Sequence, residues 1–120
     1  MVKPVLLVDD EEEIVNFLEN FLRRFKIPSI KTTSGEEAIA LYSKERIGFI
    51  FLDIQMEGID GLSVLKELKK TDPSVKVIFI TGRAEKEFYE KAKKLGAIDY
   101  ITKPLDLREL KEKIDKYILR

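Results

Sequence analysis

The chain of 120 residues contains neither cysteine nor histidine. Without cysteine it has no disulfide and no thiolate metal site. Without histidine it has no Ser–His or Cys–His catalytic pair and no imidazole ligand for a metal. The chain also cannot carry a phosphohistidine, so a phosphoryl group that passes through a histidine must come from another molecule.

The sequence also lacks an excess of one charge and lacks long apolar runs. Lys and Arg together number 22, as do Asp and Glu, so no basic excess favours nucleic acid or an anionic membrane. The apolar segments are too short to span a bilayer, and residues 1–4 do not begin a signal peptide. We therefore expect a cytoplasmic protein that binds neither nucleic acid directly nor a membrane.

The length and the hydrophobic content of the chain fit one domain over residues 1–120. Strand and helix patterns alternate along it. Short apolar segments rich in β-branched and aromatic residues predict strands at 5–8, 27–32, 49–52, 75–80 and 97–101. Five strands that alternate with five helices favour a flavodoxin-like α/β fold, a doubly wound parallel sheet with helices on both faces. Since the first strand is more apolar than the second, we predict the strand order 2-1-3-4-5.

Local signals predict several helix features. Ser34 followed by Glu37 has the pattern of a capping box at the start of the second helix, and Gly96 is expected to end the fourth. The apolar stripe of the first helix is expected to comprise Ile14, Phe17, Leu18, Phe21, Leu22 and Phe25. The stripe of the last helix, within Leu105–Arg120, is expected to comprise Leu107, Leu110, Ile114, Tyr117 and Ile118.

Polar side chains follow the carboxyl ends of four predicted strands. Asp9 and Asp10 follow the first strand, and Asp53 follows the third. Thr81 ends the fourth strand, and Lys103 follows the fifth. These ends meet at one edge of a parallel sheet, where ligands bind, and three carboxylates repel one another there unless a cation such as Mg²⁺ joins them. A carboxylate is a competent nucleophile toward phosphorus, and a metal, a lysine and a hydroxyl stabilise the transferred group.

Each of these residues also has a purely structural interpretation. The acids from Asp9 to Glu13 are typical of a helix N-terminus, and Asp53 could be a solvated loop acid. Thr81 could be an N-cap and Lys103 a surface lysine. A functional site is favoured because four neighbouring strand ends carry complementary chemistry.

The sequence resembles the receiver domain of two-component response regulators over essentially its whole length. The matching segments are Leu7-Val8-Asp9-Asp10-Glu11, Leu52-Asp53-Ile54, Asp60-Gly61, Ile80-Thr81-Gly82 and Asp99-Tyr100-Ile101-Thr102-Lys103-Pro104. The resemblance implies a signalling switch that is set by phosphorylation. Catalysis by such a domain is confined to its own phosphorylation and slow dephosphorylation, and we expect no turnover enzyme beyond that.

The resemblance implies a role for each acid at the sheet edge. Asp53 matches the phosphoryl acceptor, which also contacts the metal. Asp10 matches the direct Mg²⁺ ligand, and Asp9 matches the acid that holds the metal through water. The backbone carbonyl of Gln55 matches a further ligand.

The resemblance also implies a relay. Thr81 and Lys103 match the residues that grip the phosphoryl group. Tyr100 matches an aromatic that turns inward when the threonine hydroxyl moves toward phosphate, which changes the surface formed by the fourth helix, fifth strand and fifth helix. A half-buried strand aromatic is the alternative interpretation of Tyr100. The family usually has a cis peptide bond before the proline that matches Pro104.

Three positions near the site depart from the family or vary within it. Members commonly have Met-Pro where this chain has Met56-Glu57, so the loop loses a stiffener and gains an acid. The substitution could make the loop more mobile or alter metal binding, and the sequence does not distinguish these two consequences. Gln55 and Arg83 match positions that tune dephosphorylation. Arg83 could screen the phosphoryl group from water or face solvent, and we predict that Arg83→Ala changes the lifetime of phosphorylated Asp53.

The implied phosphodonor is a sensor histidine kinase, a phosphotransfer protein or a small phosphodonor; the downstream effector stays open. Val15 lies beside the apolar stripe of the first helix, and an exposed valine there would suit docking of a kinase. An incidental surface valine is the alternative. The sequence is either a stand-alone receiver or part of a longer regulator.

Two other functions are consistent with this fold class. One is an interaction module of the same fold that acts without phosphorylation. The other is a flavin carrier, which would need a loop rich in Ser, Thr or Gly after the first strand. The acids from Asp9 to Glu13 occupy that loop and would repel a phosphate.

Overall fold

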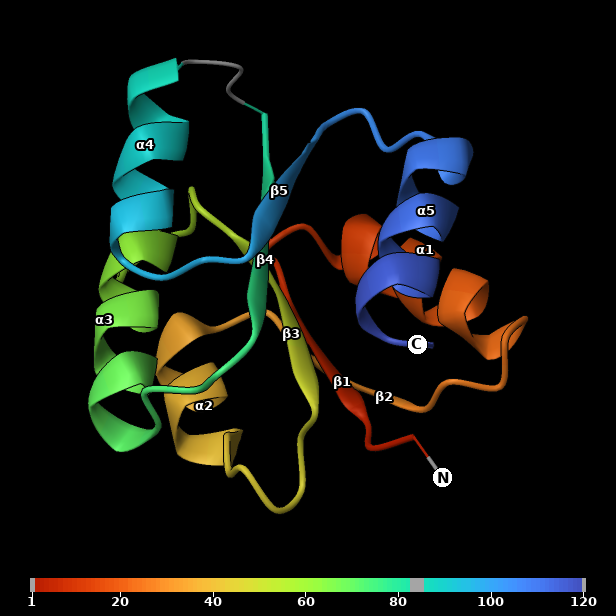
Figure 1. Cartoon of the computed structure of the whole chain (residues 1–120), viewed down its shortest axis with the longest axis horizontal. Coiled ribbons are helices and arrows are strands. Elements are labelled where there is room, and N and C mark those ends of the chain that lie inside the picture. Colours follow the sequence, from red (N-terminus) through yellow and green to blue (C-terminus); the bar gives the residue numbers. More distant parts are fainter. Residues whose placement is uncertain (1, 83–85, 120) are drawn as a thin grey trace.

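The computed structural model describes residues 2–82 and 86–119 as five strands and five helices in alternation (Figure 1). The strands are β1 (Val5–Val8), β2 (Ser29–Thr32), β3 (Phe49–Asp53), β4 (Val77–Thr81) and β5 (Asp99–Thr102). The helices are α1 (Glu12–Arg23), α2 (Gly35–Leu41), α3 (Gly61–Thr71), α4 (Lys86–Lys94) and α5 (Leu107–Tyr117). Every strand pair is parallel and the order is β2-β1-β3-β4-β5, so the predicted fold and strand order are confirmed.

The sheet is covered by helices on both faces. Figure 1 shows α1 and α5 on one side and α2, α3 and α4 on the other. Because successive residues of a strand point to opposite faces, Leu7 and Phe51 join the core beneath α1 and α5, whereas Leu6 and Leu52 join the core beneath α2, α3 and α4. The central strands are therefore apolar throughout. In the described part of the chain, no helix has both the length and the apolar character needed to cross a bilayer.

The apolar stripe of α1 differs from the prediction at two residues. Val15 is only 2% exposed and belongs to the core beneath α1, so the prediction of an exposed docking valine is wrong. Phe17, which was assigned to the stripe, is 40% exposed. Residues 15, 18 and 22 share one face of a helix, whereas residue 17 is turned by about 200° from residue 15. The buried stripe therefore includes Val15, Leu18 and Leu22, and Phe17 lies outside it.

The ends of three helices show how far local signals determine the boundaries. The Glu37 N–H donates to Ser34 Oγ at 3.2 Å, as the capping pattern predicts, but the Ser34 N–H donates to Thr32 Oγ1 at 3.1 Å. Gly96 has φ 99° just after α4, which confirms its predicted place at the end of that helix. Leu107, the first residue of α5, is 47% exposed, so its assignment to the apolar stripe of the last helix is wrong, whereas Leu110 and Ile114 are buried as predicted.

Gly61 allows α3 to begin directly against the end of β3. Its N–H donates to the carbonyl oxygen of Ile54 at 2.8 Å. A Cβ at this position would lie 2.7 Å from Ile54 Cα and would collide with the carbonyl oxygen of Asp53. No side chain fits there. The chain therefore turns tightly after β3, and residues 54–60 form a β3–α3 loop beside the carboxyl edge of the sheet.

Candidate functional site

The polar residues predicted to share the carboxyl edge of the sheet are brought together there. Asp53 is the last residue of β3, and Asp9 follows β1, the adjacent strand. Thr81 is the last residue of β4, and Lys103 follows β5, which pairs with β4. Asp9, Asp53 and Thr81 are each at most 3% exposed. These three residues are thus buried at the edge, whereas Asp10 beside them is exposed.

Three carboxylates form the centre of this cluster. Asp9, Asp10 and Asp53 each place an oxygen within 4.8 Å of oxygens of the other two. The Glu11 N–H donates to Asp9 Oδ1 at 2.9 Å, and the Gln55 N–H donates to Asp53 Oδ1 at 3.3 Å. These backbone bonds orient the two buried carboxylates and engage one oxygen of each.

Lys103 brings a positive charge against these acids. Its Nζ lies 3.0 Å from Asp9 Oδ2, 3.0 Å from Glu11 Oε1 and 3.5 Å from Asp53 Oδ2. Burial lowers the pKa of Lys103, but contacts with the carboxylates of Glu11 and Asp9 and the charge of Asp53 outweigh it, so the pKa lies above its usual value. The lysine therefore stays protonated at neutral pH. As the resemblance implies, the Lys103–Pro104 peptide bond is cis.

Negative charge exceeds positive charge at the centre of the cluster. Burial, together with the negative charge of Asp9, raises the pKa of Asp53 to about 7 against the opposing effect of Lys103. Asp9 Oδ2 is fully buried and accepts no hydrogen bond from the described residues, although Lys103 lies beside it. A bound divalent cation would relieve both features. The three carboxylates therefore fit the hard oxygen ligands that Mg²⁺ prefers.

Two contacts of the cluster were not predicted from the sequence. Glu11 was noted only as part of a motif, yet it is one of the two carboxylates closest to Lys103 Nζ. The Glu57 N–H, in the β3–α3 loop, donates to Asp10 Oδ2 at 3.2 Å. A proline at position 57 would lack this donor. The departure at Met56-Glu57 thus adds a backbone contact to Asp10.

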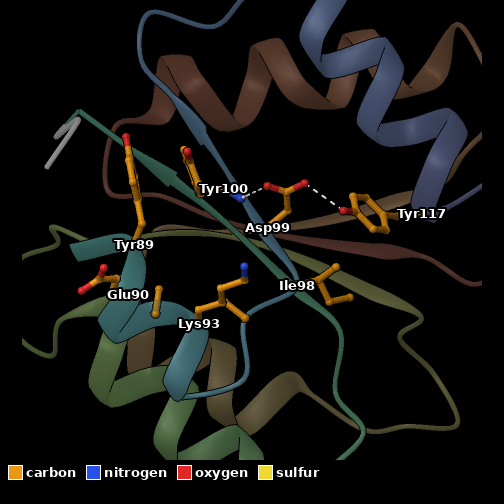
Figure 2. A pocket seen from close by; sticks show the side chains of 9 residues that line it. Tyr89, Glu90, Lys93, Ile98, Asp99, Tyr100 and Tyr117 are labelled. Carbon is orange, nitrogen blue, oxygen red and sulfur yellow. Dashed lines mark hydrogen bonds between the residues drawn. The ribbon is translucent and has the colours of Figure 1, made fainter. Parts of the chain in front are cut away.

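Tyr100 lies away from the three carboxylates. Its side chain is 39% exposed and stacks on Tyr89 of α4, with ring centroids 3.6 Å apart (Figure 2). Tyr100 pairs with Phe79 of β4, two residues before Thr81. Since residues two apart on a strand point to the same side, Tyr100 and Thr81 are diagonal neighbours on one face of the sheet.

Three predictions about single residues have different outcomes. Val15 is buried beneath α1 and offers no exposed docking surface. Arg83 lies outside the described residues, so its effect on phosphoryl lifetime stays a prediction. The role of the Gln55 carbonyl as a metal ligand also stays a prediction, although the N–H of the same residue contacts Asp53.

Residues 5–115 match the family model of the response regulator receiver domain. The chain belongs to this family. The receiver domain is 30% identical over 118 residues to sporulation initiation phosphotransferase F of Bacillus subtilis, with 98% of this chain and 95% of that protein covered. It is 34% identical over 116 residues to the response regulator SaeR of Staphylococcus aureus, with 97% of this chain covered, but it spans only 50% of the length of SaeR.

Solved structures agree with this assignment. A CheY-like receiver domain protein from Methanospirillum hungatei superposes with a TM-score of 0.88 at 28% identity, over 97% of this receiver domain and 93% of that chain. A chain of the CheX–CheY–BeF₃–Mg²⁺ complex from Borrelia burgdorferi superposes with a TM-score of 0.89 at 28% identity, over 95% and 87% of the two chains. As a member of the family, the receiver domain belongs to two-component, phosphorylation-based signalling.

Proposed function

We propose that this receiver domain accepts a phosphoryl group on Asp53 and reports its phosphorylation through Thr81 and Tyr100. The observation that carries the proposal is the environment of Asp53, a buried carboxylate at a strand end beside Lys103 and two further acids. A carboxylate in this setting has a cation at hand to stabilise phosphoryl oxygens. Because the transferred group adds negative charge beside Asp9, this cation is needed more after transfer than before it.

We assign the Mg²⁺ that receiver domains typically bind to Asp9, Asp10, Asp53 and the carbonyl of Gln55. The support is the mutual proximity of the three carboxylates and the raised pKa of Asp53. When bound, Mg²⁺ supplies positive charge that keeps the carboxylates ionised and neutralises phosphoryl oxygens.

The chemical step would use side chains already in place. An oxygen of Asp53 attacks phosphorus, the bond from phosphorus to the donor atom breaks, and the donor leaves with that electron pair. The Lys103 ammonium contacts both Asp9 and Asp53. It would stabilise the negative charge of the phosphoryl oxygens once the group is attached to Asp53. The hydroxyl of Thr81, at the end of the next strand, would donate to the same group.

Receiver domains take phosphoryl groups from histidine kinases or phosphotransfer proteins. Since none of the 120 residues is histidine, we assign the donor to a phosphohistidine outside these residues or to a small phosphodonor. Movement of Thr81 toward the phosphoryl group would open space for Tyr100, its diagonal neighbour. The surface of α4, β5 and α5 would then differ between the two states and could be recognised by an effector.

Labelling by acetyl phosphate in the presence of Mg²⁺ tests the proposal. The wild-type chain should incorporate one phosphoryl group, detected by intact mass spectrometry, and Asp53→Asn and Asp53→Ala should incorporate none. Asp115→Asn is the control, because Asp115 is an exposed α5 residue paired with Lys111 away from the site. Incorporation that persists in Asp53→Asn would contradict the assignment. A wild-type chain that takes up no phosphoryl group would instead favour an interaction module that acts without phosphorylation.

A further inference from the structure

Tyr89 of α4 and Tyr100 of β5 form a parallel stacked pair. Their ring centroids are 3.6 Å apart and their planes differ by 11° (Figure 2). Both rings border a hollow of about 420 Å³ between α4 and β5, whose lining also includes Ala92, Ala97 and Ile98. Tyr100 is 39% exposed, so it is not enclosed by the core. Among the described residues, the ring of Tyr89 covers one face of the ring of Tyr100.

The backbone that carries Tyr100 is held separately from its side chain. Asp99 Oδ1 accepts the N–H of Tyr100 at 2.8 Å. Asp99 Oδ2 accepts a hydrogen bond from the Tyr117 hydroxyl at 2.8 Å (Figure 2). It also accepts one from Lys113 Nζ at 2.6 Å, and both donors belong to α5. These contacts hold the backbone of β5 against α5, so the side chain of Tyr100 is free to rotate without a shift of this backbone.

We propose that Tyr89 is a positioning residue that latches Tyr100 in its outward orientation. The inference rests on the proposed function, in which Tyr100 turns inward when Asp53 is phosphorylated. An inward rotation must break the stack with Tyr89, because the two rings lie on different elements and one of them stays on α4. The stack thus favours the outward state before phosphorylation.

The size of the effect follows from what an aromatic pair contributes. Such a pair shifts the equilibrium between its formed and broken states by about two- to tenfold beyond simple burial. A contact that favours the outward state weakens the binding of a phosphoryl group by up to the same factor, since the two equilibria are linked. Tyr89 would therefore help to set the fraction of phosphorylated receiver in which Tyr100 has turned inward.

The test uses the full chain with its four tyrosines replaced by 3-fluorotyrosine and followed by ¹⁹F NMR. Tyr100→Phe assigns the signal of residue 100. Beryllofluoride with Mg²⁺ serves as the phosphoryl probe, and its apparent affinity is measured by titration. Tyr89→Leu removes the stack but keeps an apolar helix-forming residue, whereas Tyr89→Phe keeps an aromatic ring at the same place.

In Tyr89→Leu without beryllofluoride, the Tyr100 signal should move toward its beryllofluoride-bound position. The apparent affinity for beryllofluoride should rise about two- to tenfold, and Tyr89→Phe should restore wild-type behaviour. In a Tyr100→Ala background the same Tyr89→Leu change should leave the affinity unaltered, because the ring that it releases is absent. A merely structural role of Tyr89 would not give this dependence on Tyr100.

Two results would overturn the inference, and they are distinguishable. If beryllofluoride binds and moves the Tyr100 signal equally in the wild type and in Tyr89→Leu, at equal affinity, Tyr89 is no latch although the proposed function stands. If beryllofluoride with Mg²⁺ perturbs no signal of the wild type, the proposed function fails and the latch fails with it.

Discussion

At the scale of single residues, Asp53 is held between opposing influences. Burial and the charge of Asp9 favour its neutral form, whereas Lys103 favours its ionised form, and the balance raises the pKa to about 7. In an unfolded chain the same carboxyl group has a pKa of about 3.9. The folded state therefore binds a proton over a pH range in which the unfolded state has already lost it.

This difference predicts how stability depends on pH. The stability that Asp53 contributes is complete below about pH 4 and is lost as the pH rises through about 7. Because the sequence has no histidine, few other groups titrate in this window. The free energy of unfolding of the metal-free chain, measured by urea denaturation, should fall between about pH 4 and about pH 7 and level off above that. Asp53→Asn should reduce this fall, and an equal fall in both proteins would contradict the assignment of the raised pKa.

Glu57 offers a second test at the level of one residue, since its backbone and its side chain can be separated. Glu57→Pro removes the N–H that donates to Asp10 Oδ2 at 3.2 Å, whereas Glu57→Gln keeps the N–H and removes the charge. Loss of a hydrogen bond to a metal ligand weakens metal binding about tenfold. We expect that loss of Mg²⁺ affinity, measured by titration calorimetry, for Glu57→Pro, and an affinity close to wild type for Glu57→Gln. An equal loss in both variants would assign the effect to the carboxylate.

At the scale of elements, α1 shows what periodicity leaves undetermined. Ile14, Val15, Phe17 and Leu18 are all apolar, so the helix itself is evident from the sequence but its rotation about its axis is not. Contact with the sheet settles the rotation, because Val15 reaches the core and Phe17 does not. The sequence alone therefore does not tell that Val15 is buried and Phe17 exposed.

This assignment predicts different costs for two truncations in the same helix. Val15→Ala should lower the free energy of unfolding by about 2 kcal/mol, because it removes buried methyl groups and leaves a cavity. Phe17→Ala should change it by less than about 1 kcal/mol, since its larger side chain is 40% exposed. Urea denaturation of the two variants provides the comparison. A larger loss for Phe17→Ala would mean that the helix is rotated differently.

At the scale of the whole molecule, the architecture was predictable because it depends on local patterns. Buried strands are apolar throughout, helices carry stripes, and the alternation of the two restricts the sheet to few topologies. The polar strand ends were predictable for the same reason, since Asp9, Asp53 and Thr81 directly follow or end apolar segments. Their convergence at one edge then follows from the parallel sheet.

Contacts between distant segments were not predictable in this way. Lys103 and Glu11 are 92 positions apart, and Glu57 and Asp10 are 47 positions apart. Each contact depends on a loop path and on side-chain rotamers that no periodic pattern encodes. The stack of Tyr89 on Tyr100 likewise requires the placement of α4 against β5. The fold and the identity of the central acids are thus predictable from the sequence. The side chains and backbone groups that contact those acids are known only from the structure.

The identity of the phosphorylated side chain is open to direct chemical observation. After incubation with acetyl phosphate and Mg²⁺, borohydride reduces an aspartyl phosphate to homoserine, which peptide mass spectrometry locates in the sequence. Homoserine at position 53, and at none of the other seven aspartates of the chain, is the expected result. Homoserine at position 9 or 10, or no homoserine at all, would contradict the assignment of Asp53 as the phosphoryl acceptor.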